Sequence, residues 1–166
     1  MAYLSICLMA KDEARYLEEF LAYHIIKGVD YFYIYYDKNS NDIELLKSII
    51  KPYIKLNKVK LELCETGGYQ AYIYNDCKKK YVNDNTWIAF IDADELINCE
   101  GDIKNELKKI DNENKSLCYI NSIHFNHNGK LKYENELQIK RFPKHQAYIN
   151  SFKCVINVKK TSSRRI

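Results

Sequence analysis

The feature that most constrains the fold is a short apolar run that ends abruptly in acidic residues. Residues 87–91 read Trp-Ile-Ala-Phe-Ile, and Asp92, Asp94 and Glu95 follow within the next four positions. An apolar run of this length, rich in β-branched and aromatic side chains, is typical of a strand that is buried on both faces in a parallel sheet. The acids then lie at the carboxyl end of the strand, the edge at which open α/β sheets bind their ligands.

The pair Asp92 and Asp94 has the chemistry of a divalent cation site. Two aspartates one residue apart offer oxygen ligands to Mg²⁺ or Mn²⁺, which take few protein carboxylates and complete their shell with water and phosphate oxygens. The same residues also fit an acidic turn that does no more than cap the next helix, and this short pattern alone leaves both interpretations open.

Strands and helices alternate along the first two thirds of the chain. Asp12 is expected to cap the first helix and Gly28 to end it, whereas Pro52 is expected to stop the second helix. This alternation predicts an α/β fold with a doubly wound, mainly parallel sheet and right-handed crossovers. The predicted strands cover residues 3–9, 31–36, 59–64 and 87–96, and the predicted helices follow the first three strands, ending near residues 27, 50 and 81.

The regular alternation of predicted strands and helices ends after residue 100. A helix is predicted over residues 102–110, followed by strands over 117–125, 131–142 and 152–158. The turn at residues 126–129, Asn-His-Asn-Gly, indicates an antiparallel hairpin between the first two of these strands. We therefore expect one domain over residues 1–160 with a small antiparallel C-terminal part, and a flexible tail over 161–166.

Composition excludes several classes of protein. The net charge of +4 is compatible with an anionic small molecule or with peripheral contact to a membrane surface, but it is too small to indicate nucleic acid binding. No stretch approaches the ~20 apolar residues of a membrane span. The six cysteines contain no Cys-x-x-Cys pair, which argues against a zinc knuckle and favours free thiols in a cytoplasmic setting.

Four blocks of the chain are similar to known motifs. Residues 11–24 are similar to N-E-x-x-Y-L-x-E-W-x-x-Y-H, and residues 28–42 to G-V-x-x-F-x-I-Y-D-N-x-S-x-D. Residues 70–72 and 87–96 are similar to Q-x-x-A-Y and W-[IV]-x-F-[IL]-D-x-D-E-[FL]. In this order, and over residues 3–158, the blocks resemble glycosyltransferase family 92 and its bacterial family-2-like relatives.

This resemblance implies a GT-A fold, the nucleotide-diphospho-sugar transferase fold, and a role for each acid. Asp92 and Asp94 would form the D-x-D pair that holds Mn²⁺ or Mg²⁺ on the diphosphate of a nucleotide sugar, and Asp94 would be the more direct ligand. Asp37 would contact the nucleoside, with UDP as the expected nucleotide. Asp94 and Glu95 are the catalytic candidates, although Glu95 is expected to point to the opposite face of an extended strand from Asp94.

The function that follows is metal-dependent, inverting transfer of a hexose from a UDP-sugar to a hydroxyl of a glycan or glycolipid. Two alternatives remain open. Relatives continue beyond the block that resembles residues 153–156, so a truncated, non-catalytic GT-A domain that binds a nucleotide or a partner is one alternative. A D-x-D phosphatase is the other, but there the motif follows the first strand rather than the fourth.

Three histidines and one glycine-containing loop have less specific interpretations. His24 lies on the apolar face of the first predicted helix, where a hydrogen-bonded structural histidine is the commoner case. His124 and His127 fit solvated turn positions near the predicted hairpin. Residues 65–68 read Glu-Thr-Gly-Gly, for which an ordinary turn is commoner than a backbone approach to a nucleotide.

Overall fold

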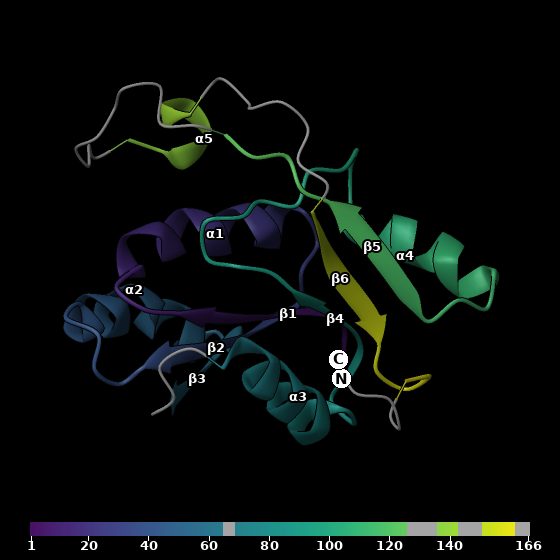
Figure 1. The fold of residues 1–166 in the computed structure, drawn as a ribbon, viewed down its shortest axis with the longest axis horizontal. Coiled ribbons are helices and arrows are strands. Elements are labelled where there is room, and N and C mark those ends of the chain that lie inside the picture. The colour runs from purple at the N-terminus through teal and green to yellow at the C-terminus, as the bar shows by residue number, and fades with distance from the viewer. Residues whose placement is uncertain (65–68, 126–135, 143–150, 162–166) are drawn as a thin grey trace.

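A six-stranded sheet forms the centre of the molecule (Figure 1). The structure is a computed structural model that describes residues 1–64, 69–125, 136–142 and 151–161. The strand order is β3-β2-β1-β4-β6-β5; the first four strands are parallel, and β6 runs antiparallel to both β4 and β5. The strands are β1 (Ala2–Ala10), β2 (Tyr31–Asp37), β3 (Val59–Cys64), β4 (Asn85–Phe90), β5 (Leu117–Asn121) and β6 (Phe152–Asn157). The α/β fold with a small antiparallel part is therefore confirmed.

Helices cover both faces of the sheet. Helices α1 (Ala14–Ile26), α2 (Ile43–Lys55) and α4 (Ile103–Asn112) lie on one face, and α3 (Gln70–Tyr81) lies on the other (Figure 1). The larger core, beneath α1, α2 and α4, includes Phe20, Leu46 and Trp87. The smaller core, beneath α3, includes Ile73 and Cys77. Strands β1 and β4 contribute to both cores, which explains their continuous apolar sequences.

The strand order reverses between β1 and β4. From β1 the chain crosses by α1 to β2, and it later returns by α3 on the opposite face to form β4 beside β1. Because the two crossovers leave the sheet on opposite sides, a crevice opens between the carboxyl ends of β1 and β4. This switch point is the place where an open α/β sheet binds a ligand.

Two predicted boundaries in the first half are wrong. Helix α2 continues through Pro52 to Lys55, because Ile49 and Tyr53 on either side of the proline pack against the larger core. The N-cap of α1 is Glu13 rather than Asp12, whose φ is +56°. The first turn is capped from a neighbouring loop, since the Ala14 N–H donates to Asp42 Oδ2 at 2.8 Å.

The C-terminal half also departs from the prediction. Strand β5 pairs with β6, so the hairpin between residues 117–125 and 131–142 is wrong where the chain is described. Residues 138–141 form the short helix α5 (Gln138–Arg141) instead of a strand, because the Glu19 carboxylate of α1 accepts hydrogen bonds from the Gln138 and Ile139 N–H groups at 2.7 and 3.3 Å. The turn at 126–129 lies outside the described residues.

At the C-terminal end, Thr161 is buried, and its hydroxyl donates to the Asn157 carbonyl at 2.6 Å. Residues 162–166 of the predicted tail lie outside the described residues. Among the helices that the structure describes, none is long and apolar enough to cross a membrane.

Candidate functional site

A pocket of about 330 Å³ lies at the carboxyl ends of β1 and β4, at the switch point of the sheet. One wall comes from the end of β1 and the loop before α1, and the other from the acidic residues after β4 and the first residue of α3. Three of its side chains are carboxylates, so an electropositive or metal-bound ligand group suits the site better than an apolar one. The lining residues are Met9, Ala10, Lys11, Glu13, Gln70, Asp92 and Asp94.

The acids after β4 form a turn instead of continuing the strand. The strand ends at Phe90, and the Glu95 N–H donates back to the Asp92 carbonyl at 3.2 Å. The Glu95 carboxylate accepts from the Asp92 N–H at 3.0 Å. The extended strand that was expected to carry Glu95 and Asp94 is therefore wrong, because the chain folds back on itself after Phe90 and the Glu95 carboxylate turns toward the Asp92 N–H. We call residues 92–95 the acid turn.

Helix α1 holds the segment just beyond the acid turn. The Nδ1–H of His24 donates to the Phe20 carbonyl at 2.8 Å, which leaves Nε2 to accept from the Ile97 N–H at 3.2 Å. The Tyr23 hydroxyl donates to the Ile97 carbonyl at 3.1 Å. His24 is completely buried, and this burial lowers its pKa to about 4. The structural interpretation of His24 is confirmed, and its partner is the segment that carries the acids.

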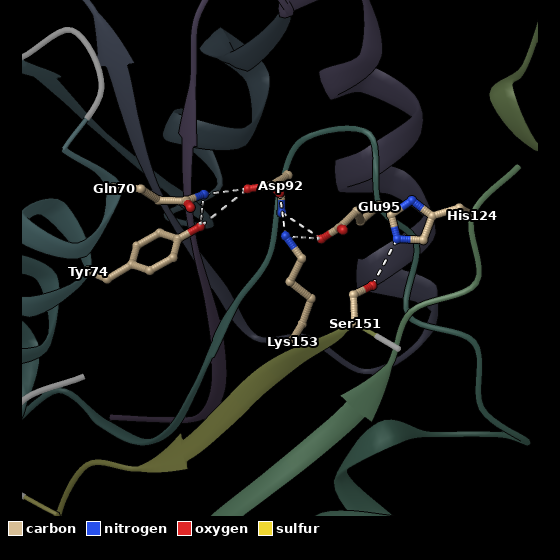
Figure 2. A network of polar contacts seen from close by, with 7 residues as sticks. All are labelled: Gln70, Tyr74, Asp92, Glu95, His124, Ser151 and Lys153. Atoms are coloured by element: carbon tan, nitrogen blue, oxygen red, sulfur yellow. Dashed lines mark hydrogen bonds and ion pairs between the residues drawn. The ribbon is translucent and has the colours of Figure 1, made fainter. Parts of the chain in front are cut away.

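Asp92 is surrounded by donors from two elements, α3 and β6 (Figure 2). Its Oδ1 accepts from Gln70 Nε2 at 2.6 Å, and the Tyr74 hydroxyl lies 3.4 Å away. Its Oδ2 is paired with the Lys153 ammonium group, which also lies 3.0 Å from Glu95 Oε2. Burial raises the pKa of Glu95, and the Asp92 N–H and Lys153 partly offset this effect.

Asp94 differs from Asp92 in being exposed at the pocket. Glu13 lines the same pocket from the start of α1. Burial, together with the negative charges of Asp94, Asp92 and Asp42, raises the pKa of Glu13 to about 7. Burial is the larger cause of this shift, and a bound cation would offset the part that comes from the neighbouring carboxylates.

Asp37 lies at the same edge of the sheet, at the end of β2, but it does not line the pocket. It is buried, accepts from the Asn39 N–H at 2.8 Å and pairs with Lys11 at 3.5 Å. The Asn39 N–H and the Lys11 charge hold the pKa of Asp37 below its usual value, against the opposing effect of desolvation. Since Lys11 lines the pocket and is half-exposed, it connects Asp37 to the pocket.

His124 lies outside this group. It is exposed, and its Nε2 lies 2.9 Å from Ser151 Oγ at the start of β6 (Figure 2). His127 and the loop at residues 65–68 lie outside the described residues.

The sequence interpretation missed three charged residues of the site. Lys11 and Glu13 could have been found by the rule that identified the acids after β4, because they follow a predicted parallel strand at the same sheet edge. Lys153 could not, because it lies 61 positions beyond Asp92 and reaches it only through the pairing of β6 with β4.

No group of three or more histidine, cysteine, aspartate or glutamate side chains within the described ranges is arranged to hold a metal ion. A metal at this pocket would therefore need ligands in addition to those that the described residues supply. Mg²⁺ and Mn²⁺ can complete such a site with substrate phosphates and water.

Several solved structures have a similar fold. S. aureus TarS (residues 1–349) is 21% identical with a TM-score of 0.54, and its complex with UDP is 19% identical with a TM-score of 0.53; each match covers 69% of this chain and 34% of that one. The WbbM bifunctional glycosyltransferase is 12% identical with a TM-score of 0.55, over 97% of this chain and 32% of that one. This chain thus spans about a third of those chains, and the similarity shows a GT-A fold.

A third neighbour is 4-diphosphocytidyl-2C-methyl-D-erythritol synthase from Anaerococcus prevotii. It is 12% identical with a TM-score of 0.51, and the match covers 95% of this chain and 71% of that one. A comparison with curated proteins gives no match.

The family comparison covers nearly the whole chain. The model of glycosyltransferase family 92 matches residues 2–165. This match confirms the resemblance seen in the four sequence blocks, and it is to a glycosyltransferase family rather than to a family of phosphatases. The chain belongs to glycosyltransferase family 92.

Proposed function

We propose that the pocket binds the diphosphate of a UDP-sugar and that the protein transfers the hexose, with inversion, to a hydroxyl of a glycan or glycolipid. The observation that carries this proposal is the position of Asp94, Asp92 and Glu13 around one pocket at the switch point of a GT-A sheet. The fold similarity to TarS, which has been solved with UDP, supports UDP as the nucleotide.

The donor set fits a divalent cation of the Mg²⁺ or Mn²⁺ type. Asp94 is an exposed carboxylate on the pocket wall, and after burial its negative charge is the next contribution to the raised pKa of Glu13. Asp94, with Asp92 next to it, would hold the ion, and the remaining ligands would be phosphate oxygens and water. When bound, such an ion supplies Lewis-acid stabilisation of the leaving diphosphate.

The other residues have supporting roles in this proposal. Asp37 accepts hydrogen bonds from the nucleoside once Lys11 turns from it toward the phosphates. Glu95 positions the acid turn, because its carboxylate is already bonded to the Asp92 N–H and to Lys153. We also propose a cytoplasmic setting, which the six free cysteines support.

Thermal unfolding with and without ligands tests the proposal. UDP with Mn²⁺ should raise the melting temperature of the protein, since a ligand at about 100 times its Kd stabilises the folded state by about 2.7 kcal/mol. Asp94→Asn should abolish the Mn²⁺-dependent part of this shift without changing the melting temperature of the free protein. Glu44→Gln, at an exposed acid paired with Lys47 on α2, is the matched control and should respond like the wild type.

Two results contradict the proposal: no stabilisation of the wild type by any nucleoside diphosphate, or a full Mn²⁺-dependent shift in Asp94→Asn. Metal-dependent release of UDP from a panel of UDP-sugars then separates a transferase from a domain that only binds the nucleotide.

A further inference from the structure

Lys153 supplies a positively charged side chain that pairs with the acid turn, although it lies far from the turn in the sequence. It lies on β6, next to β4 in the sheet, and its side chain extends to Asp92 and Glu95 (Figure 2). The Lys153 side chain is 27% exposed, and those of Asp92 and Glu95 are 33% and 28% exposed. The ammonium group is therefore anchored on two carboxylates while it remains accessible.

The hydrogen-bonding capacity of Lys153 is not used up by this anchoring. An ammonium group has three N–H donors. Among the residues that the structure describes, contacts with Asp92 and Glu95 engage two of them, so one donor is left for a group outside the pair. A lysine ammonium is a compact point charge that commonly binds phosphate.

The pairing also separates the two aspartates of the D-x-D motif. Asp92 is held by Lys153 and Gln70, whereas Asp94 is exposed at the pocket. The Lys153 ammonium group thus places a positive charge beside Asp92. Asp92 lines the pocket in which the proposed function places the diphosphate.

We propose that Lys153 is a diphosphate-binding residue of the donor site, which donates its remaining N–H to a phosphate oxygen while Asp92 and Glu95 hold it in place. The inference rests on the proposed function, because it concerns how the same site recognises its nucleotide. It gives the donor site a cation of its own in addition to any metal ion, so part of the affinity for UDP is independent of metal.

A purely structural ion pair is the competing interpretation, and the chain contains a matched control for it. Lys104 pairs with Asp30 at 2.8 Å, and the two side chains are 24% and 32% exposed. Asp30 also accepts from the Tyr3 and Leu4 N–H groups near the start of β1, at the sheet edge opposite the pocket. Loss of this pair should affect stability without affecting nucleotide binding.

Calorimetric titration with UDP and with uridine, each in EDTA and in Mn²⁺, tests the inference. In EDTA, Lys153→Met should weaken UDP binding about tenfold or more, the size expected for one hydrogen bond between charged groups. Uridine lacks phosphates and should bind Lys153→Met as it binds the wild type. Lys153→Arg should keep most of the UDP affinity, and Lys104→Met should keep all of it.

The outcomes separate the two proposals. If the wild type binds no UDP even with Mn²⁺, the proposed function fails. If the wild type binds UDP and Lys153→Met binds it equally well in EDTA, only the role of Lys153 fails. Equal losses for UDP and uridine would also overturn that role, because they would indicate a damaged fold. If Lys153→Met does not fold, the same comparison between Lys153→Gln and Lys153→Arg decides whether the charge is needed.

Discussion

At the scale of single residues, His24 shows how a buried polar group can serve a site that it does not line. Both of its ring nitrogens are hydrogen-bonded inside the molecule, one within α1 and the other to Ile97 beyond the acid turn. Tyr23 bonds the carbonyl of the same residue, so α1 fixes both backbone polar groups of Ile97. A histidine in this position has to stay neutral, since a protonated Nε2 cannot accept the Ile97 N–H.

This requirement predicts a pH dependence of stability. Burial lowers the pKa of His24 to about 4, against 6.5 for an ordinary histidine side chain, so the unfolded chain takes up a proton in a range where the folded protein does not. The contribution of His24 is therefore fully present above pH 6.5 and is lost as the pH falls from 6.5 to 4, by up to about 3 kcal/mol. Urea unfolding at pH 7.5 and 4.5 should show a smaller loss in His24→Gln than in the wild type.

The exposed histidine His124 supplies the control for this experiment. His124→Gln should retain the pH dependence of the wild type. An unchanged pH dependence in His24→Gln would show that this ring is not the group that titrates.

Residue-scale features differ in how far the sequence predicts them. Asp92 and Asp94 could be identified because their position depends only on the strand that precedes them. The bond from His24 to Ile97 and the contact of Lys153 with Asp92 depend on packing between elements 73 and 61 positions apart, which no local pattern records.

At the scale of elements, the turn after α1 brings two helices together, α1 and α4. Gly28 ends α1, with its N–H donating to the Ile25 carbonyl at 3.0 Å and the Val29 N–H to the His24 carbonyl at 2.9 Å. This pattern is the Schellman motif, and the φ of +97° explains why glycine is needed there. The turn also abuts α4, since a Cβ at Gly28 would lie 2.3 Å from Asp102 Oδ1, the N-cap oxygen of that helix.

Gly28→Ala should therefore destabilise the protein for two separate reasons. An alanine at positive φ costs about 1–2 kcal/mol, and displacement of the Asp102 cap costs about 1 kcal/mol more. Gly101→Ala is the matched control, because its φ is +70° but no atom lies within 4 Å of the added Cβ. Chemical unfolding should show a loss for Gly28→Ala that exceeds the loss for Gly101→Ala by about 1 kcal/mol; equal losses would mean that the contact with Asp102 is not important.

The element order was predictable over the first ninety residues because each strand and helix there has a clear apolar period. Prediction failed where a distant element decides the local structure. Glu19 of α1 caps the helix at residues 138–141. In the sheet, β6 lies between β4 and β5, so the described strand that pairs with β5 is β6 and not the next predicted strand in the sequence.

At the scale of the whole molecule, the sheet separates two cores of different size. Cys7 and Cys77 are fully buried in the smaller one, and burial raises the pKa of Cys7 well above its usual value. The other four cysteines are partly exposed, and all six are free thiols.

Thiol reactivity should report the integrity of the smaller core. In the native protein a disulfide reagent such as DTNB should modify Cys7 and Cys77 only as fast as the core opens, whereas the partly exposed cysteines react sooner. Cys77→Ser should remove a slow-reacting thiol, and Cys118→Ser a faster one. A single fast rate for all six thiols in the native protein would contradict the packing of α3 on the sheet.

The position of β6 in the sheet also has a consequence for protein synthesis. The ribosome makes β4 and β5 before β6, yet β6 lies between them, so the edge of β4 stays unpaired until residues 152–157 have emerged. A nascent chain that has completed its first four strands already carries Asp92, Asp94 and Glu13, but it lacks the ammonium group that balances the acid turn. The charge balance of the pocket is thus established by the last strand of the sheet to be translated.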